Sequence, residues 1–427
     1  MGMKRLSLLM ISFLLLVGIF AGCSNNTATP GNNDKPGGKD DIVTLNLFQF
    51  KVEIADDLQK MIKEFEDEHP TIKVKLETVG GGADYGAALK AKFASGEEPD
   101  IFNNGGFKEL ELWQEHLADL SNEPWVENLL PIGKVPMTGE DGKLYGMPVN
   151  LEGYGFIYNK DLFEQAGISK APTTITELQA ASQKLKDSGI TPFSAGYAEW
   201  WVIGQHLLNI PFAQQDDPEA FIEGLYNGTE SMVGNKHFEN FKAVLDAEIG
   251  FANSNPLTTD YNSQVTLFAS GQTAMLQQGN WTENMIYDIN PDINMAFLPI
   301  PLSNGAEADR LPVGVPNNWA INKKSKNIEE AKTFLNWMVS SETGKRYITE
   351  EFAFIPAFSN IEPSGLGALG QSILEYSKED KTVPWTWFMW PDGANKEFAA
   401  TIQEYAAGRI DYDTVLQRFQ NSWDNLK

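Results

Sequence analysis

The sequence predicts an α/β protein that folds as two lobes, and three observations lead to this prediction. Residues 42–427 remain to fold once an N-terminal leader and linker are set aside, and this length suits two domains. The hydrophobic fraction of 42% and the aromatic fraction of 11% are enough to form hydrophobic cores. From Ile42 onward, segments with the period of a strand alternate with segments with the period of a helix. Such a mixture over this length suits two α/β lobes with a ligand bound between them.

The first strand–helix–strand unit is predicted between residues 42 and 76. Residues 42–48 form the first predicted strand, and the helix that follows ends at His69-Pro70. Apolar side chains recur at helical spacing along it, at Ile54, Leu58, Met61, Ile62 and Phe65. The second strand alternates apolar and polar residues and carries Ile72, Val74 and Leu76. A unit of this kind favours parallel pairing of its strands with a right-handed crossover.

Later helices are delimited by capping signals. Thr174 and Glu177 match a capping box, and Ser188-Gly189 ends that helix. Asn327 is the predicted N-cap of a helix that carries Ile328, Ala331, Phe334, Leu335 and Met338. Two helices are predicted near the C-terminus: the first carries Phe398, Ile402 and Tyr405 and ends at Gly408, and the second carries Leu416, Phe419 and Trp423.

The N-terminus has the layout of an export signal. Lys4 and Arg5 precede an apolar run over residues 6–20 that is short for a membrane-spanning helix. Residues 20–23, Phe-Ala-Gly-Cys, resemble a bacterial lipobox, although Leu is more frequent than Phe at the first position. The resemblance implies a lipoprotein signal peptide over 1–22 and acylation (palmitate) of Cys23, which anchors the protein to the cell membrane. The alternative is an ordinary cleaved signal with an incidental thiol. Residues 23–41 are polar and rich in Gly, Asn and Pro, which is typical of a flexible tether.

Composition and missing motifs exclude several function classes. The net charge of −25 disfavours binding to nucleic acid, and the single cysteine excludes intramolecular disulfides. Motifs of the types GxxxxGK[ST], HExxH and GxSxG are absent from the sequence, and the four histidines lack the spacing of metal ligands. We therefore expect no cofactor and no metal site. We also expect a monomer that is a binding protein and not an enzyme.

Four segments together resemble the bacterial extracellular solute-binding proteins (family 1) of the maltose-binding type, which serve ABC-type importers. The segments are KFASGEEPDI at 92–101; GKLYGMP at 142–148 with YNKDLF at 158–163; FASGQTAM at 268–275 with GNW at 279–281; and GVPNNWAIN at 314–322. Their order and spacing match that family across nearly the whole chain after the leader.

The resemblance implies a two-lobed, periplasmic-binding-protein-like clamp whose chain crosses between the lobes three times. The crossings are expected near 148–152, 312–318 and 356–362. Residues 42–151 plus 319–357 would form the N-terminal lobe, and residues 152–318 plus 358–427 the C-terminal lobe. The partners implied are an oligosaccharide ligand and the membrane permease subunits of an ABC importer, and the implied location is the extracellular face of the bacterial cell membrane.

A saccharide site needs aromatic rings for stacking and short polar side chains for hydrogen bonds. Tryptophans gather in loop candidates at Trp200, Trp201, Trp281, Trp385, Trp387 and Trp390. Trp281 is the first choice, because the resemblance places an aromatic platform there and Gly279 permits close approach of the backbone. Ordinary burial in the core is the alternative for each of these rings, and for Trp113, Trp337 and Trp423 it is the preferred interpretation.

Polar ligand contacts are inferred at positions that match the family pattern. These positions are Gln49, Glu53, Asn103, Asn104, Asn150, Glu152, Glu199, Asn317, Asn318 and Asp392. A turn or helix cap is the alternative for each asparagine. Only four arginines follow the leader and none lies in the aromatic loops, so we expect a neutral ligand. Lys51 is the one cation in the first ligand loop that could pair with an acid.

Two rival functions stay open at this point. A secreted glycoside hydrolase also combines tryptophans with carboxylates, and 58 acidic residues always allow a pair to be proposed. A binding protein for a peptide, an amino acid or a metal is the second rival, and the scarcity of Arg, His and Cys near the predicted cleft counts against it.

Overall fold

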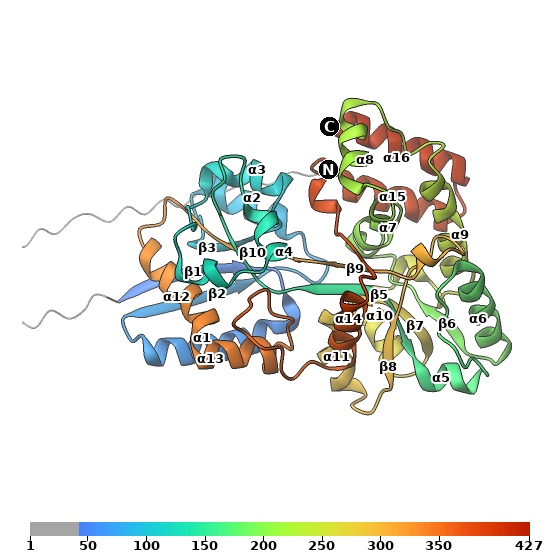
Figure 1. Ribbon diagram of the computed structural model, residues 1–427, viewed down its shortest axis with the longest axis horizontal. Helices are drawn as coiled ribbons and strands as arrows, with labels where there is room; N and C mark the ends of the chain where they lie inside the picture. The colour runs from blue at the N-terminus through green and yellow to red at the C-terminus, as the bar shows by residue number, and fades with distance from the viewer. Residues whose placement is uncertain (1–41) are drawn as a thin grey trace, which may run out of the picture. The chain divides into compact units, whose positions relative to one another are not determined.

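The computed structural model describes residues 42–427 (Figure 1). The predicted signal peptide 1–22, the lipidation site Cys23 and the tether 23–41 lie outside the described residues. Within residues 42–427 there are two β-sheets, each with hydrophobic cores of its own, and we call the two halves the N-terminal lobe and the C-terminal lobe. Across 42–427, no helix combines the length and the apolar character needed to cross a membrane.

The N-terminal lobe is built on a five-stranded sheet with the order β2-β1-β3-β10-β4. Its strands are β1 (Val43–Gln49), β2 (Ile72–Thr78), β3 (Ile101–Asn104), β4 (Met147–Pro148) and β10 (Asn318–Ile321). β1 and β2 pair in parallel with Val43 opposite Ile72, which confirms the predicted strand–helix–strand unit. β10 is antiparallel to both β3 and β4, so a late segment of the chain completes the sheet.

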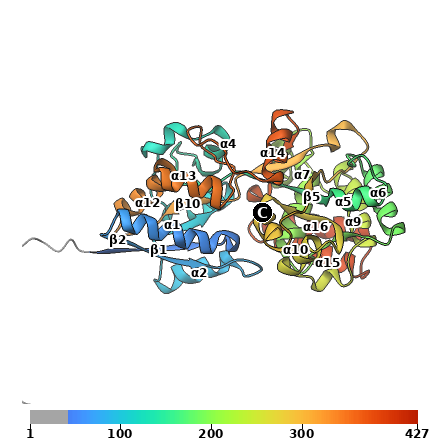
Figure 2. The same cartoon turned by 90° about the horizontal axis from the view of Figure 1, so that it is seen from below.

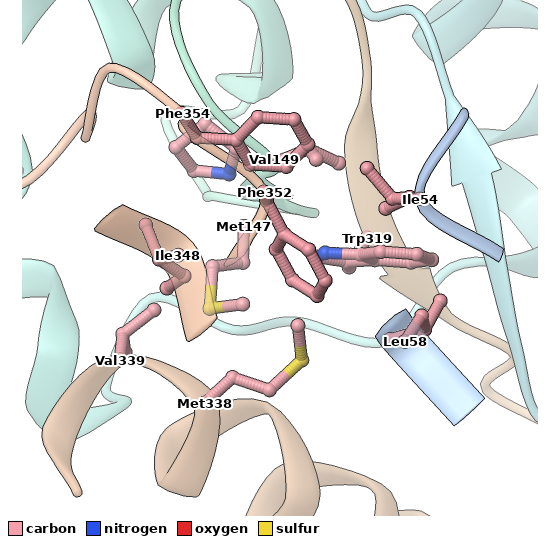
Figure 3. A pocket seen from close by; sticks show the side chains of 11 residues that line it. Ile54, Leu58, Met147, Val149, Trp319, Met338, Val339, Ile348, Phe352 and Phe354 are labelled. Atoms are coloured by element: carbon pink, nitrogen blue, oxygen red, sulfur yellow. The ribbon is translucent and has the colours of Figure 1, made fainter. Parts of the chain in front are cut away.

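Helices cover this sheet and close its core (Figures 1 and 2). They are α1 (Ala55–Glu68), α2 (Tyr85–Ser95), α3 (Lys108–Trp113), α4 (Pro131–Lys134), α12 (Ile328–Ser340) and α13 (Glu342–Arg346). α1 buries the predicted stripe of Leu58, Met61, Ile62 and Phe65. Trp113 and Trp337 are buried in the same core, as predicted. A small apolar cavity lies inside this lobe, and Figure 3 shows Phe352, Trp319 and Met338 among the side chains around it.

The C-terminal lobe is built on a second sheet with the order β11-β9-β5-β7-β6, in which β8 also pairs with β5. Its strands are β5 (Glu152–Asn159), β6 (Thr191–Ser194), β7 (Thr273–Gly279), β8 (Met295–Leu298), β9 (Leu311–Gly314) and β11 (Thr382–Val383). β5 and β7 are almost completely buried, so this sheet is covered on both faces.

Three helices of the C-terminal lobe were predicted, namely the one after Thr174, the one that ends at Gly408 and the one that carries Leu416, and all three are present. The helices of this lobe are α5 (Lys160–Gln165), α6 (Ile175–Asp187), α7 (Leu208–Ala213), α8 (Pro218–Asn227), α9 (Lys236–Gly250), α10 (Tyr261–Ala269), α11 (Glu283–Ile289), α14 (Ala368–Lys378), α15 (Ala394–Ala406) and α16 (Tyr412–Leu426). The Thr174 hydroxyl accepts a hydrogen bond from the Glu177 amide at 3.2 Å, which confirms the predicted cap of α6. α15 and α16 pack against each other, and Trp423 of α16 is fully buried.

The chain passes between the two sheets three times. Residues 149–151 join β4 to β5, residues 315–317 join β9 to β10, and the segment before α14 makes the third passage. The Val149 amide donates to the Asn317 carbonyl at 3.0 Å, and the Leu151 amide donates to the Ile355 carbonyl at 2.8 Å. The first passage is therefore hydrogen-bonded to both of the others.

Candidate ligand-binding site

A pocket lies where the segment after β1 meets the segment after β7. It is lined by Glu53, Ile54, Asn280, Trp281, Asn284, Phe352, Ala353 and Phe354. Glu53 and Ile54 belong to the short helix η1 (Val52–Ile54) next to the N-terminal sheet, and Asn280 and Trp281 belong to η7 (Asn280–Thr282) at the end of β7. Side chains from both lobes thus share one pocket, which contains two of the predicted ligand residues, Glu53 and Trp281.

Trp281 is held in place by its neighbours in the chain. Its indole nitrogen donates to the Gln278 side-chain oxygen at 3.1 Å. The ring lies so close to the backbone that a Cβ atom on Gly279 would be 2.0 Å from Cζ3 of the indole. Trp281 is only half-buried, so part of the ring is free to contact a ligand.

Four of the predicted tryptophans surround one imidazole. His206 is the centre of this group, and its ring centroid lies 4.7 Å from that of Tyr154, 5.0 Å from Trp281, 5.3 Å from Trp201, 5.3 Å from Trp387 and 6.3 Å from Trp385. We call these six rings the aromatic cluster. Burial lowers the pKa of His206 to about 3, so the imidazole is neutral. Neither His206 nor Tyr154 was predicted as a ligand residue, because neither carries a recognisable local signal.

A buried ion-pair group lies between the two lobes. The Lys51 ammonium is 2.5 Å from a carboxylate oxygen of Glu152 and 3.0 Å from one of Glu53. The Asn150 amide donates to the same Glu152 oxygen at 3.0 Å. Burial disfavours the charged ammonium of Lys51, but the two carboxylates outweigh this effect and raise its pKa. The group therefore holds two carboxylates against one cation.

Two other acidic residues that the sequence selected have partners within the protein. The Glu199 carboxylate is buried and accepts hydrogen bonds from the Trp201 indole at 3.2 Å and from the Tyr261 amide at 3.1 Å. It therefore orients a member of the aromatic cluster. Asp392 is exposed and forms an ion pair with Lys90 of the N-terminal lobe at 2.8 Å.

The remaining predicted tryptophans lie outside the aromatic cluster. Trp390 is buried in the core of the C-terminal lobe, with its ring 4.3 Å from Phe212 and 5.7 Å from Phe398. Trp200 is half-buried, and the ammonium of Lys396 lies 5.4 Å from its ring centroid.

The predicted amides mostly bond to nearby backbone. The Gln49 amide accepts from the Lys51 amide at 2.6 Å and donates to the Lys51 carbonyl at 2.9 Å. Asn104 accepts from the Gly106 amide, Asn103 from the Phe50 amide, and Asn317 from the Asn318 amide. Among these predicted amides, three buried atoms have no hydrogen-bond partner within residues 42–427, namely Nδ2 of Asn103, Oδ1 of Asn150 and Oδ1 of Asn318. These atoms are available to a ligand or to water.

Comparison with known proteins identifies the family. A family model described as bacterial extracellular solute-binding protein matches residues 51–345. The chain belongs to this family. This solute-binding protein is 24% identical to the melibiose/raffinose/stachyose-binding protein MelE of Bacillus subtilis (strain 168), over 100% of this chain and 97% of that protein. It is 26% identical to the multiple sugar-binding protein of Streptococcus mutans serotype c, over 81% of this chain and 80% of that protein.

Solved structures of similar proteins share the fold. RafE in complex with raffinose superposes on this solute-binding protein with a TM-score of 0.78 at 22% identity, over 90% of this chain and 100% of that one. A sugar transporter from Bacillus licheniformis in complex with stachyose gives a TM-score of 0.75 at 25% identity, over 90% of this chain and 100% of that one. These likenesses confirm the predicted two-lobed α/β fold.

Family membership also bears on function and location. The members are binding proteins, so the prediction of a binding protein instead of an enzyme is confirmed. Extracellular solute-binding proteins work outside the cytoplasm, as was predicted for this chain. The lipid anchor at Cys23 and the monomeric state stay predictions.

Proposed function

We propose that this protein captures a neutral oligosaccharide outside the cytoplasm and delivers it to the permease subunits of an ABC-type importer. The observation that carries the proposal is the aromatic cluster next to the pocket of Glu53 and Trp281. Indole rings offer flat faces to the C–H faces of a sugar, while carboxylates and amides at the rim accept its hydroxyl protons. The relatives named for melibiose, raffinose, stachyose and multiple sugars support a ligand of this class.

The charge of the site supports a neutral ligand. Lys51, the one cation that could have met an acid, is buried and already paired with Glu53 and Glu152. A uronic acid placed nearby would add a third carboxylate to two, and an unpaired buried charge costs several kcal/mol. We expect a neutral di- to tetrasaccharide to bind at least tenfold more tightly than its uronic-acid counterpart, a difference of about 1.4 kcal/mol.

We propose that the three passages between the sheets act as a hinge. Because the first passage is hydrogen-bonded to both of the others, the two lobes would move as rigid bodies when they close around the ligand. A monomer should then have a smaller radius of gyration with ligand than without it in solution scattering. Identical scattering curves would contradict the hinge.

The lipid anchor is part of the same proposal. Cys23→Ala should move the protein from the membrane fraction to the medium, or leave its leader uncleaved, because the acylated thiol is the only anchor proposed. Unchanged fractionation would contradict anchoring at Cys23.

A ligand screen by thermal shift tests the central proposal. Melibiose, raffinose and stachyose form the neutral set, and a uronic-acid oligosaccharide, an amino acid and a short peptide form the comparison set. A ligand at 100 times its dissociation constant should stabilise the fold by about 2.7 kcal/mol. No shift with any neutral oligosaccharide, or a larger shift with a member of the comparison set, would contradict the proposed function.

The aromatic platform is tested by one substitution. Trp281→Ala should weaken oligosaccharide binding by about tenfold to a thousandfold, because part of an indole of about 200 Å² no longer contacts the sugar. Folding should be retained, since the ring is only half-buried. Calorimetry that finds normal affinity would move the platform to Trp201, Trp385 or Trp387.

A further inference from the structure

We infer that His206 contacts the ligand directly and selects which sugar hydroxyl the aromatic cluster accepts. This inference rests on the proposed function and goes beyond it, because it names the residue that discriminates between sugars of the same size.

The backbone around His206 has an uncommon form. Residues Val202–Leu207 form a π-helix, a widened turn that is frequent at functional sites. The carbonyl of His206 accepts the Tyr154 hydroxyl at 2.8 Å, and the two rings are stacked at an interplanar angle of 22°. Tyr154 is fully buried in β5 and thus covers one face of the imidazole.

The other sides of the imidazole face tryptophans. Trp201 meets it edge-on at 74°, and Trp281 and Trp387 are tilted toward it at 54° and 45°. Of these, Trp281 also lines the pocket. The imidazole is therefore a direct neighbour of the ring on which we expect the sugar to stack.

The polar atoms of this cluster are incompletely paired. His206 is 6% exposed, and its Nδ1 atom has no hydrogen-bond partner among residues 42–427. The indole nitrogen of Trp385, in the same cluster, is also buried and has no partner in the described part of the chain. Buried polar atoms are mostly hydrogen-bonded, so these two unpaired atoms of one aromatic cluster are candidates to bond a sugar hydroxyl.

The chemistry of a neutral imidazole fits a hydroxyl. One ring nitrogen donates a hydrogen bond and the other accepts one, and a sugar hydroxyl can do both. A carboxylate can only accept, and an ammonium can only donate. Because the buried ring stays neutral, it presents the same pair of groups throughout the ordinary range of pH.

The test compares His206→Phe with the wild-type protein. Phenylalanine keeps an aromatic ring in the cluster and removes both nitrogens, so the ligand-free melting temperature should stay within a few degrees. Calorimetry with raffinose should show at least tenfold weaker binding. His237→Phe is the matched control, since His237 lies at the start of α9, outside the cluster, and its affinity should equal that of the wild type.

Monodeoxy analogues of raffinose separate direct contact from packing. In the wild type, one analogue should bind at least tenfold more weakly than raffinose. In His206→Phe, that analogue and raffinose should bind equally, because the partner of the missing hydroxyl is gone. If His206→Phe does not fold, His206→Asn replaces it, and it should fold and recover part of the discrimination, since its amide supplies a donor and an acceptor near the position of Nδ1.

Two results would overturn the inference alone: raffinose binding by His206→Phe within threefold of the wild type, or unchanged discrimination among the deoxy analogues in the substituted protein. Failure of the wild type to bind any neutral oligosaccharide would instead overturn the proposed function, and the inference with it. The two failures are therefore distinguishable in the same set of titrations.

Discussion

Gly279→Ala should displace the sugar-stacking ring while leaving the backbone in place. Gly279 has φ −120° and ψ −178°, an extended conformation that alanine adopts readily. The added Cβ atom, however, would be 2.0 Å from Cζ3 of Trp281. Non-bonded carbons prefer about 3.5–4.0 Å, so the indole has to move by about 1.5 Å or more. The movement also breaks the geometry of its hydrogen bond to Gln278.

The expected loss of affinity follows from the contact area. If the displaced indole loses about half of its 200 Å² to the sugar, then about 100 Å² at 25 cal/mol per Å² is lost, or about 2.5 kcal/mol. This corresponds to an affinity roughly 50- to 100-fold lower in calorimetry with raffinose or stachyose.

A matched control uses the same chemical change elsewhere. A Cβ atom on Gly250, at the end of α9, would have no heavy atom within 4 Å, so Gly250→Ala should leave binding unchanged. If Gly279→Ala folds and binds within twofold of the wild type, the sugar does not stack on Trp281.

Three further predictions concern charge. Burial raises the pKa of Glu248 to about 7, so the stability that its protonated form contributes is complete at low pH and is lost as the pH rises through 7. In urea unfolding, Glu248→Gln should therefore stabilise the fold by about 1–3 kcal/mol at pH 8 and by little at pH 4.5. The control Glu239→Gln, at an exposed position of the same helix, should leave the stability unchanged at both pH values. Lys51→Met leaves the buried carboxylate of Glu152 and the partly buried carboxylate of Glu53 without their cation and should cost about 3–5 kcal/mol. A loss below about 1 kcal/mol would contradict the buried ion-pair group. Lys90→Glu should weaken ligand binding by up to about fivefold at low salt, because the exposed ion pair of Lys90 with Asp392 joins the two lobes. The double variant Lys90→Glu with Asp392→Lys exchanges the two charges and should restore the affinity. An equal loss of affinity at 1 M salt would argue against an electrostatic cause.

Local sequence signals were sufficient for most of the fold. The apolar stripe of α1 and the alternation in β2 depend on periodicity alone, and both elements formed where predicted. The cap at Thr174 needs only a hydroxyl three residues before an amide, and it too formed. Asn327 occupies its predicted N-cap position, but the expectation that its side chain caps α12 was wrong. Its amide instead donates to the Thr44 carbonyl of β1 at 3.5 Å, a partner that a local pattern cannot reveal.

The candidate site was predicted less completely than the fold. Trp281 was recognisable because an aromatic residue directly after Gly-Asn matched a family pattern, and it does line the pocket. His206 lies in the mostly apolar segment 202–213, and a single histidine in such a segment is usually a core residue. Only the π-helix and the tryptophans brought from residues 281, 385 and 387 give that imidazole its surroundings. Such contacts depend on tertiary packing, so no spacing rule could have found them.

The position of β10 has a consequence for the synthesis of the chain. This strand lies between β3 and β4, yet it follows residues 152–317 in the sequence. In a nascent chain that has emerged as far as residue 151, β3 can pair with β1 on one side, but its other edge is open because β10 has not yet been made. Exposed strand edges promote association between chains, and pairings between distant segments form slowly. A fragment that stops at residue 151 is thus expected to aggregate, and the N-terminal lobe can be completed only after most of the C-terminal lobe has been made.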